Sequence, residues 1–139
     1  MLVVDAGRLV AAAATRDRNH GRCVALLSEA EPPLVVPALV VTEVAYLLAD
    51  RIGHAAEQAF ARSLRDGELF VEPVEPSDWV RITELLDEYA DLPLGLGTVD
   101  ASVVATCERL AVETLATLDR RHFSVVRPRH CETLTLLPD

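Results

Sequence analysis

The chain has 139 residues and a formal net charge of −9, and it is 50% hydrophobic but only 4% aromatic. A chain of this length is typical of one domain, here with a core of Ala, Val and Leu. No apolar run reaches the roughly 18 residues of a membrane span, and the start MLVVDAG lacks the basic segment of a signal peptide. We therefore expect a single domain, residues 1–139, that is cytoplasmic and has no contact with a membrane.

Cysteine and lysine usage narrow the class of site. The cysteines Cys23, Cys107 and Cys131 are far apart and odd in number, which favours free thiols over a disulfide framework or a CxxC metal site. All 13 basic residues are Arg. The lack of Lys excludes a P-loop lysine, a Schiff-base lysine and any receiver or phosphatase site that requires one. The negative net charge argues against nonspecific, whole-surface binding of nucleic acid, although not against a local site.

Short apolar runs alternate with helical patterns along the chain. The predicted strands are residues 1–4, 34–36, 68–74 and 113–118, with 125–126 as a possible further strand. The predicted helices cover about 8–14, 20–30, 37–52, 54–66, 76–90 and 98–110, and residues 92–97 are expected to form a loop. This alternation is typical of an α/β fold with a mainly parallel sheet.

Some acidic residues stand out because they directly follow a predicted strand or lie in the first turns of a predicted helix. They are Asp5, Glu43, Asp100 and Asp119. In a parallel sheet, the carboxyl ends of the strands and the amino ends of the following helices share one edge. Carboxylates that meet there repel one another, and their pKa values rise unless a cation lies between them. Oxygen ligands of this kind favour Mg²⁺ or Mn²⁺, which can activate a water molecule for attack on a phosphodiester.

Each acid, taken alone, also fits an ordinary structural role. Glu43 lies near a helix start, where the helix dipole favours a negative charge. Asp5 and Asp119 fit turn residues at strand ends, and Asp100 fits an acid in the first helical turn after a Thr98 cap. The residues by themselves leave these alternatives open.

Segments along the whole chain resemble the PIN-domain ribonucleases, most closely the VapC-type toxins of bacterial toxin–antitoxin modules. They are VVDAG at 3–7, TEVAYLL at 42–48, VDASVVATCERL at 99–110 and ETLATLDRRHFSVVRP at 113–128. The resemblance implies a PIN-like three-layer α/β/α sandwich with a central, mainly parallel sheet of about five strands. It also implies an endoribonuclease dependent on Mg²⁺ or Mn²⁺, a homodimer, and inhibition by a small VapB-type antitoxin.

The family's acidic site carries over onto particular residues of this chain. The resemblance implies that Asp5, Glu43, Asp100 and Asp119 form the catalytic and metal-binding set, with Thr117 as an accessory residue. Many relatives carry Ser or Thr directly after the first Asp, whereas this chain has Ala6-Gly7. A hydroxyl contact from that turn to metal or phosphate is therefore not expected.

The basic residues gather in one segment near the C-terminal end. Residues 120–130 hold four arginines and no acid: Arg120, Arg121, Arg127 and Arg129. RNA that approaches an acidic pocket needs a local positive rim, and we expect these arginines to supply it. A second candidate is the cluster Arg16, Arg18 and Arg22. The histidines at positions 20, 54, 122 and 130 are expected at the surface, without a role in the reaction.

Two other functions remain compatible with parts of the sequence. One is a catalytically silent PIN-like module that binds RNA or a protein partner; the full set of acids argues against it. The other is a phosphoaspartate receiver-like or phosphatase-like domain. Asp5-Ala6-Gly7 lacks the second Asp of a D-x-D nucleophile motif, and the absence of Lys argues further against this class.

Overall fold

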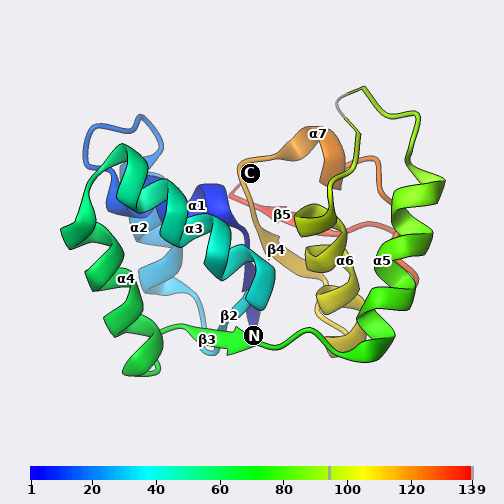
Figure 1. Ribbon diagram of the computed structural model, residues 1–139, viewed down its shortest axis with the longest axis horizontal. Coiled ribbons are helices and arrows are strands. Elements are labelled where there is room, and N and C mark those ends of the chain that lie inside the picture. The colour runs from blue at the N-terminus through cyan, green and yellow to red at the C-terminus, as the bar shows by residue number, and fades with distance from the viewer. Residues whose placement is uncertain (94, 139) are drawn as a thin grey trace.

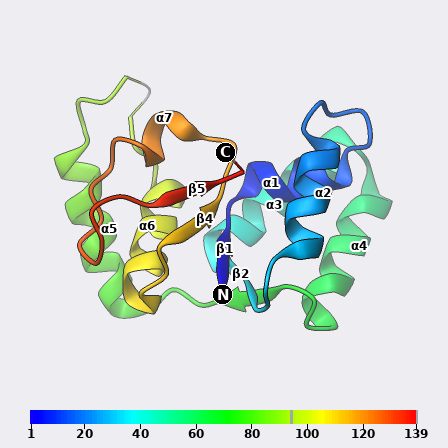
Figure 2. The same cartoon turned by 180° about the vertical axis from the view of Figure 1, so that it is seen from behind.

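The five strands form one sheet in the order β3-β2-β1-β4-β5, and each neighbouring pair is parallel. The computed structural model describes residues 1–93 and 95–138. The strands are β1 (Leu2–Val4), β2 (Leu34–Pro37), β3 (Phe70–Glu72), β4 (Thr114–Ala116) and β5 (Thr135–Leu137). Because all strands run the same way, their carboxyl ends lie together at the edge of the sheet opposite the N-terminus (Figure 2).

Helices cover both sides of the sheet. They are α1 (Ala6–Ala13), α2 (His20–Glu29), α3 (Ala38–Arg51), α4 (His54–Arg65), α5 (Pro76–Glu88), α6 (Thr98–Leu110) and α7 (Arg120–Phe123). Helices α1 to α4 lie on one side of the sheet, and α5 and α6 lie on the other (Figure 1). The predicted three-layer α/β/α sandwich with a parallel sheet of about five strands is therefore confirmed.

The core is built from the aliphatic residues that the composition predicted. All three residues of β1 are buried, since this central strand is covered on both faces. Helices α3, α5 and α6 add their inner faces to the same cluster: Val40, Val44, Leu48, Ile82, Leu85, Val103, Val104 and Cys107. The cysteines are free, as expected. None of the helices in the described residues is long and apolar enough to cross a membrane.

The C-terminal part of the chain differs from the predicted pattern. The possible strand at 125–126 is wrong, because the backbone N–H groups of Val125 and Val126 both donate to the carbonyl of His122 at 3.1 Å. This segment therefore closes the short, unpredicted helix α7. The fifth strand is β5, which pairs with β4. The predicted loop 92–97 has neither helix nor strand in its described residues, and Leu94 lies outside them.

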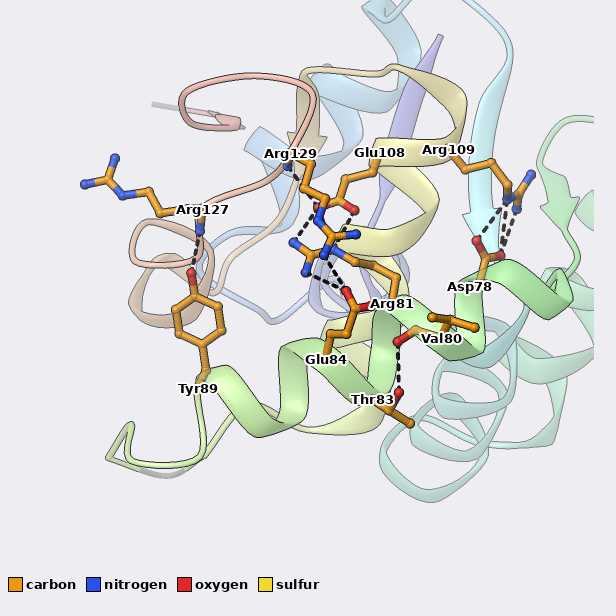
Figure 3. A network of polar contacts seen from close by, with 10 residues as sticks. All are labelled: Asp78, Val80, Arg81, Thr83, Glu84, Tyr89, Glu108, Arg109, Arg127 and Arg129. Atoms are coloured by element: carbon orange, nitrogen blue, oxygen red, sulfur yellow. Dashed lines mark hydrogen bonds and ion pairs between the residues drawn. The ribbon is translucent and has the colours of Figure 1, made fainter.

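Ion pairs hold α5 against α6 on the face remote from the N-terminal helices (Figure 3). Arg81 donates two hydrogen bonds from Nε and one from Nη2 to the Glu108 carboxylate, at 2.8–3.1 Å. Only 9% of the Arg81 side chain and 11% of the Glu108 side chain are exposed. Arg109 reaches from the last turn of α6 to Asp78 in the first turn of α5. These contacts fix the position of α6, which carries Asp100.

We expect Glu108→Ala to lower the free energy of unfolding by about 3 kcal/mol, because it leaves the nearly buried Arg81 guanidinium without its main partner. Arg129→Ala is the matched control. It removes an ion pair with Glu84 in which both side chains are well exposed, so we expect a loss below about 1 kcal/mol. Urea denaturation followed by circular dichroism measures both values. Equal losses in the two variants would contradict the importance assigned to burial.

Candidate active site

A pocket of about 560 Å³ opens at the carboxyl-end edge of the sheet. Its lining combines acids with small, apolar and basic residues: Asp5, Ala6, Gly7, Glu43, Leu47, Asp100, Leu118, Asp119, Arg120 and Arg121. The four predicted acids thus come from four separate segments and line one cavity. Ala6 and Gly7 contribute no hydroxyl group to it.

Asp5 lies at the centre of this arrangement, between the end of β1 and the start of α1. Its backbone N–H donates to the carbonyl of Ala116 on β4 at 2.9 Å. The buried hydroxyl of Thr117 donates to Asp5 Oδ2 at 2.9 Å, and Thr117 Oγ1 accepts the backbone N–H of Asp119 at 3.0 Å. Thr117, expected to be an accessory residue, therefore lies between the two aspartates and contacts both.

Burial dominates the electrostatics of Asp5, which is 7% exposed. The pKa of this carboxyl is raised to about 6: loss of hydration is the largest cause, and the nearby Asp100 and Glu43 act in the same direction. Hydrogen bonds from the Ala6 backbone and the Thr117 side chain oppose the rise, since they favour the ionised form. A carboxyl with this pKa is poised to exchange its proton for a cation near neutral pH.

Glu43 stands on the wall of the pocket, in the second turn of α3. Because α3 begins at Ala38, the glutamate lies beyond the first turn, where the helix dipole has its main effect. Partial burial and the neighbouring Asp100 both raise the pKa of Glu43. The helix dipole therefore does not account for the position of Glu43, whereas a place beside the other acids of the pocket does.

Asp100 and Asp119 reach the pocket from helix starts. Asp100 is in the first turn of α6, and burial together with Asp119 raises its pKa, whereas His122 acts in the opposite direction. Asp119 caps α7: its Oδ1 accepts the backbone N–H groups of Arg121 at 3.1 Å and His122 at 3.3 Å. Asp119 therefore has both a structural role, in the turn after β4, and a place in the lining of the pocket.

His122 was not expected to belong to the site, and the prediction of a surface position is wrong. The residue is 8% exposed, and its Nδ1 lies 3.1 Å from Asp100 Oδ2 and 3.2 Å from Asp119 Oδ2. It follows Asp119 by three residues, a spacing that brings two side chains together on a helix. That spacing has meaning only within a helix, and the sequence pattern does not predict α7.

The four rim arginines separate into two pairs. Arg120 and Arg121 line the pocket with the acids. Arg127 and Arg129 do not: the Arg127 side chain points away from the polar network, and Arg129 pairs with Glu84 on the α5–α6 face (Figure 3). The expectation that all four form one rim fails because α7 and the following turn carry the chain away from the pocket.

The donor set of the pocket fits a hard divalent cation. Carboxylate oxygens converge from Asp5, Glu43 and Asp100, and burial raises the pKa of each. Asp100 raises the pKa values of Asp5 and Glu43 further, and Asp119 raises that of Asp100. Asp100, Asp119 and His122 also offer ligand atoms within 4.8 Å of one another. Clustered anions of this kind are stabilised when a cation neutralises them, and oxygen-rich sites favour Mg²⁺ or Mn²⁺ over softer metals.

Comparisons with known proteins identify the family of this chain. The chain is 30% identical over 137 residues to Ribonuclease VapC26 of Mycobacterium tuberculosis, covering 99% of this chain and 100% of that protein. Its structure superposes on the Sarcin-Ricin loop cleaving toxin VapC20 of M. tuberculosis with a TM-score of 0.83 at 23% identity, covering 95% and 99% of the two chains. FitAcB of Neisseria gonorrhoeae matches at a TM-score of 0.60 and 17% identity, over 87% of this chain and 89% of that one. The sequence pattern of the PIN domain matches residues 2–127, and the chain therefore belongs to the PIN-domain family.

Proposed function

We propose that this chain is a metal-dependent endoribonuclease that acts as the toxin of a toxin–antitoxin pair and hydrolyses RNA phosphodiesters with water. The observation that carries the proposal is the convergence of Asp5, Glu43, Asp100 and Asp119 on one pocket. The ribonuclease name of the relative that is 30% identical over the whole chain supports the same reaction. A silent binding module would have no need of clustered acids in which burial and neighbouring carboxylates raise the pKa values of Asp5, Glu43 and Asp100.

Asp5 and Asp100 are the main candidates for holding the metal, because both are largely buried beside the pocket and neither is paired with an arginine in the described residues. Glu43, from α3, and Asp119, from the cap of α7, add two further carboxylates to the same pocket. A bound Mg²⁺ or Mn²⁺ supplies an activated water and neutralises charge on the phosphate. Thr117 keeps Asp5 in place through its 2.9 Å hydrogen bond.

Arg120 and Arg121 supply positive charge at the mouth of this otherwise acidic pocket. Both side chains are exposed, so they can meet an RNA backbone before it reaches the acids. Arg120 also donates to the carbonyls of Leu136 and Pro138, which holds its stem against the end of β5. Because four acids line the same pocket, we expect it to attract phosphate only at its mouth, near these two arginines.

We further propose that the active chain is a homodimer and that a VapB-type antitoxin inhibits it. The relative that is 30% identical is a VapC ribonuclease, and the structural relative VapC20 is a toxin; both support a partner of this kind. An antitoxin side chain with a positive charge, Arg or Lys, would suit this pocket, because it could form charge-assisted hydrogen bonds with the same carboxylates.

Asp5→Asn and Asp100→Asn should each reduce Mg²⁺- or Mn²⁺-dependent RNA cleavage to below about one hundredth of the parent rate, because each removes an anionic ligand. Both variants should keep the parent circular dichroism spectrum. Asp87→Asn, which changes an exposed acid of α5 outside the pocket, is the control and should cleave at the parent rate. Parent-like cleavage by the two pocket variants would refute the assignment of the site.

The contribution of Asp5 to the stability of the metal-free protein should fall as the pH rises from about 4 to about 7. Since the pKa of Asp5 is about 6 in the native state against 3.8 in the reference state, the native state binds more protons in this range. The stabilisation is complete below 3.8 and is lost as the pH passes about 6. Each pKa unit corresponds to about 1.4 kcal/mol, so ionisation of Asp5 lowers the unfolding free energy by about 3 kcal/mol.

The difference between the parent chain and Asp5→Asn isolates this effect in urea denaturation at several pH values without metal. The variant should be the more stable of the two at pH 7, and saturating Mn²⁺ should stabilise the parent far more than the variant. A constant difference across the pH range would show that burial does not perturb Asp5.

The arginine pair is tested by the salt dependence of RNA affinity, measured in the inactive Asp5→Asn background. Arg120→Ala with Arg121→Ala should lower the slope of log affinity against log salt by about 1.4, or about 0.7 per lost phosphate contact with single-stranded RNA. Arg129→Ala is the control and should leave the slope unchanged, because Arg129 is paired with Glu84 away from the pocket. An unchanged slope in the double variant would instead favour the surface of Arg16 and Arg18 as the path of the phosphates.

A further inference from the structure

His122 contacts both acids that reach the pocket from helix starts. Its Nδ1 is 3.1 Å from Asp100 Oδ2 and 3.2 Å from Asp119 Oδ2. A carboxylate oxygen accepts hydrogen bonds, so the nitrogen that faces both of them is a donor. We propose that His122 is a positioning residue whose Nδ1–H bridges Asp100 and Asp119 and holds them in the arrangement that binds metal. This inference rests on the proposed function, which makes the pocket a metal site.

The surroundings of Nε2, the other imidazole nitrogen, indicate that His122 does more than fill space. Nε2 is buried, and among the residues that the structure describes it has no hydrogen-bond partner. A buried polar atom without a partner is unfavourable, and an apolar side chain would fill the same space without that penalty. Within the described part of the chain, the polar contacts of the ring are therefore those of Nδ1 with the two carboxylates.

The bridge treats the two aspartates differently. Asp119 Oδ1 caps α7 by accepting the backbone N–H groups of Arg121 and His122, and its Oδ2 faces the imidazole. Both oxygens of Asp119 are thus engaged within its own short helix. Asp100 is held at Oδ2 alone, which leaves Oδ1 for the pocket. His122 therefore orients Asp100 as the ligand and uses Asp119 as the anchor.

The rival arrangement makes Nδ1 itself a metal ligand beside the two carboxylates, since the three ligand atoms lie within 4.8 Å of one another. That arrangement requires the hydrogen to move to Nε2, where it would be a buried N–H group without an acceptor in the described residues. A buried donor in that state is more unfavourable than a vacant lone pair, so the geometry favours the bridge.

Three substitutions at position 122 separate the roles of the two nitrogens. The side-chain amide of Asn can place a donor near the position of Nδ1, whereas the amide of Gln reaches toward the position of Nε2. His122→Ala and His122→Gln should weaken Mn²⁺ binding by about tenfold to a hundredfold in titration calorimetry, and His122→Asn should restore most of the affinity. The conservative rescue is a result that loss of packing alone would not give.

His130→Ala is a matched control for removing a half-satisfied histidine. His130 also has one nitrogen bonded, from Nε2 to the carbonyl of Val112 at 2.8 Å, and one buried nitrogen without a partner in the described residues. It lies in a different cavity from the acids. This variant should bind Mn²⁺ with the parent affinity, and an equal loss of affinity at both positions would overturn the proposal.

Nitrogen-15 NMR of the histidine-labelled parent chain provides a readout that needs neither activity nor a substitution at position 122. Nδ1 of His122 should carry a hydrogen at one fixed pH both without metal and with saturating Mg²⁺. Loss of that hydrogen on addition of Mg²⁺ would make Nδ1 a ligand and overturn the bridge. If the parent chain binds neither Mn²⁺ nor Mg²⁺, the metal site of the proposed function is refuted. The bridge is then tested separately: if Asp100→Asn does not change the NMR signal of the hydrogen on Nδ1, the bridge is refuted as well.

Discussion

The hydrogen-bonded contact between the ends of β1 and β4 is the interaction on which the site depends. The Asp5 backbone continues the pairing of these strands by donating to Ala116, and Thr117 then donates its hydroxyl to the Asp5 carboxylate. The same hydroxyl oxygen accepts the N–H of Asp119, so one buried threonine sets the relation between two pocket acids that are far apart in sequence. Glu43 and Asp100 are added by α3 and α6, which pack their apolar faces into the same core.

This arrangement works against the stability of the metal-free fold. Burial raises the pKa values of Asp5, Glu43 and Asp100, and neighbouring acids add to the rise, so ionisation of these groups lowers the stability of the fold. The opposing contributions come from elsewhere in the molecule. The apolar core is continuous from β1 to the inner faces of α3, α5 and α6, and the nearly buried pair of Arg81 and Glu108 joins α5 to α6. The fold tolerates the electrostatic cost of the site because the apolar core and the pair of Arg81 and Glu108 do not depend on the acids of the pocket.

The parts of this molecule that could be predicted from sequence are those governed by local pattern. The alternation of apolar strands and amphipathic helices was enough to predict the parallel sheet. The rule that strand ends share an edge was enough to predict that the four acids lie close together. The fifth strand was not predicted, because Val125 and Val126 have the stronger β-propensity, whereas β5 is short and follows an irregular segment. Their backbone groups bond to His122 instead, a contact that depends on tertiary structure.

The residues of α7 show why the rest of the site was beyond sequence reasoning. A helix of four residues has no detectable apolar period, and so short a helix is unstable alone. It forms here because Asp119 caps it and because Phe123 and Val126 are buried beneath it. Only once that helix exists do Arg120 and Arg121 face the pocket and His122 face Asp100, while Arg129 is carried away from it.

The choice between a structural and a functional role for Asp119 is therefore not a real alternative. Its carboxylate caps α7, and that helix places His122 against Asp119 itself and against Asp100. Loss of the cap would remove the histidine from the pocket together with the charge of the aspartate. The contact that caps α7 is made by Asp119 Oδ1, and the contact with the His122 imidazole is made by Oδ2 of the same carboxylate. The stability of α7 and the geometry of the site are therefore linked through Asp119.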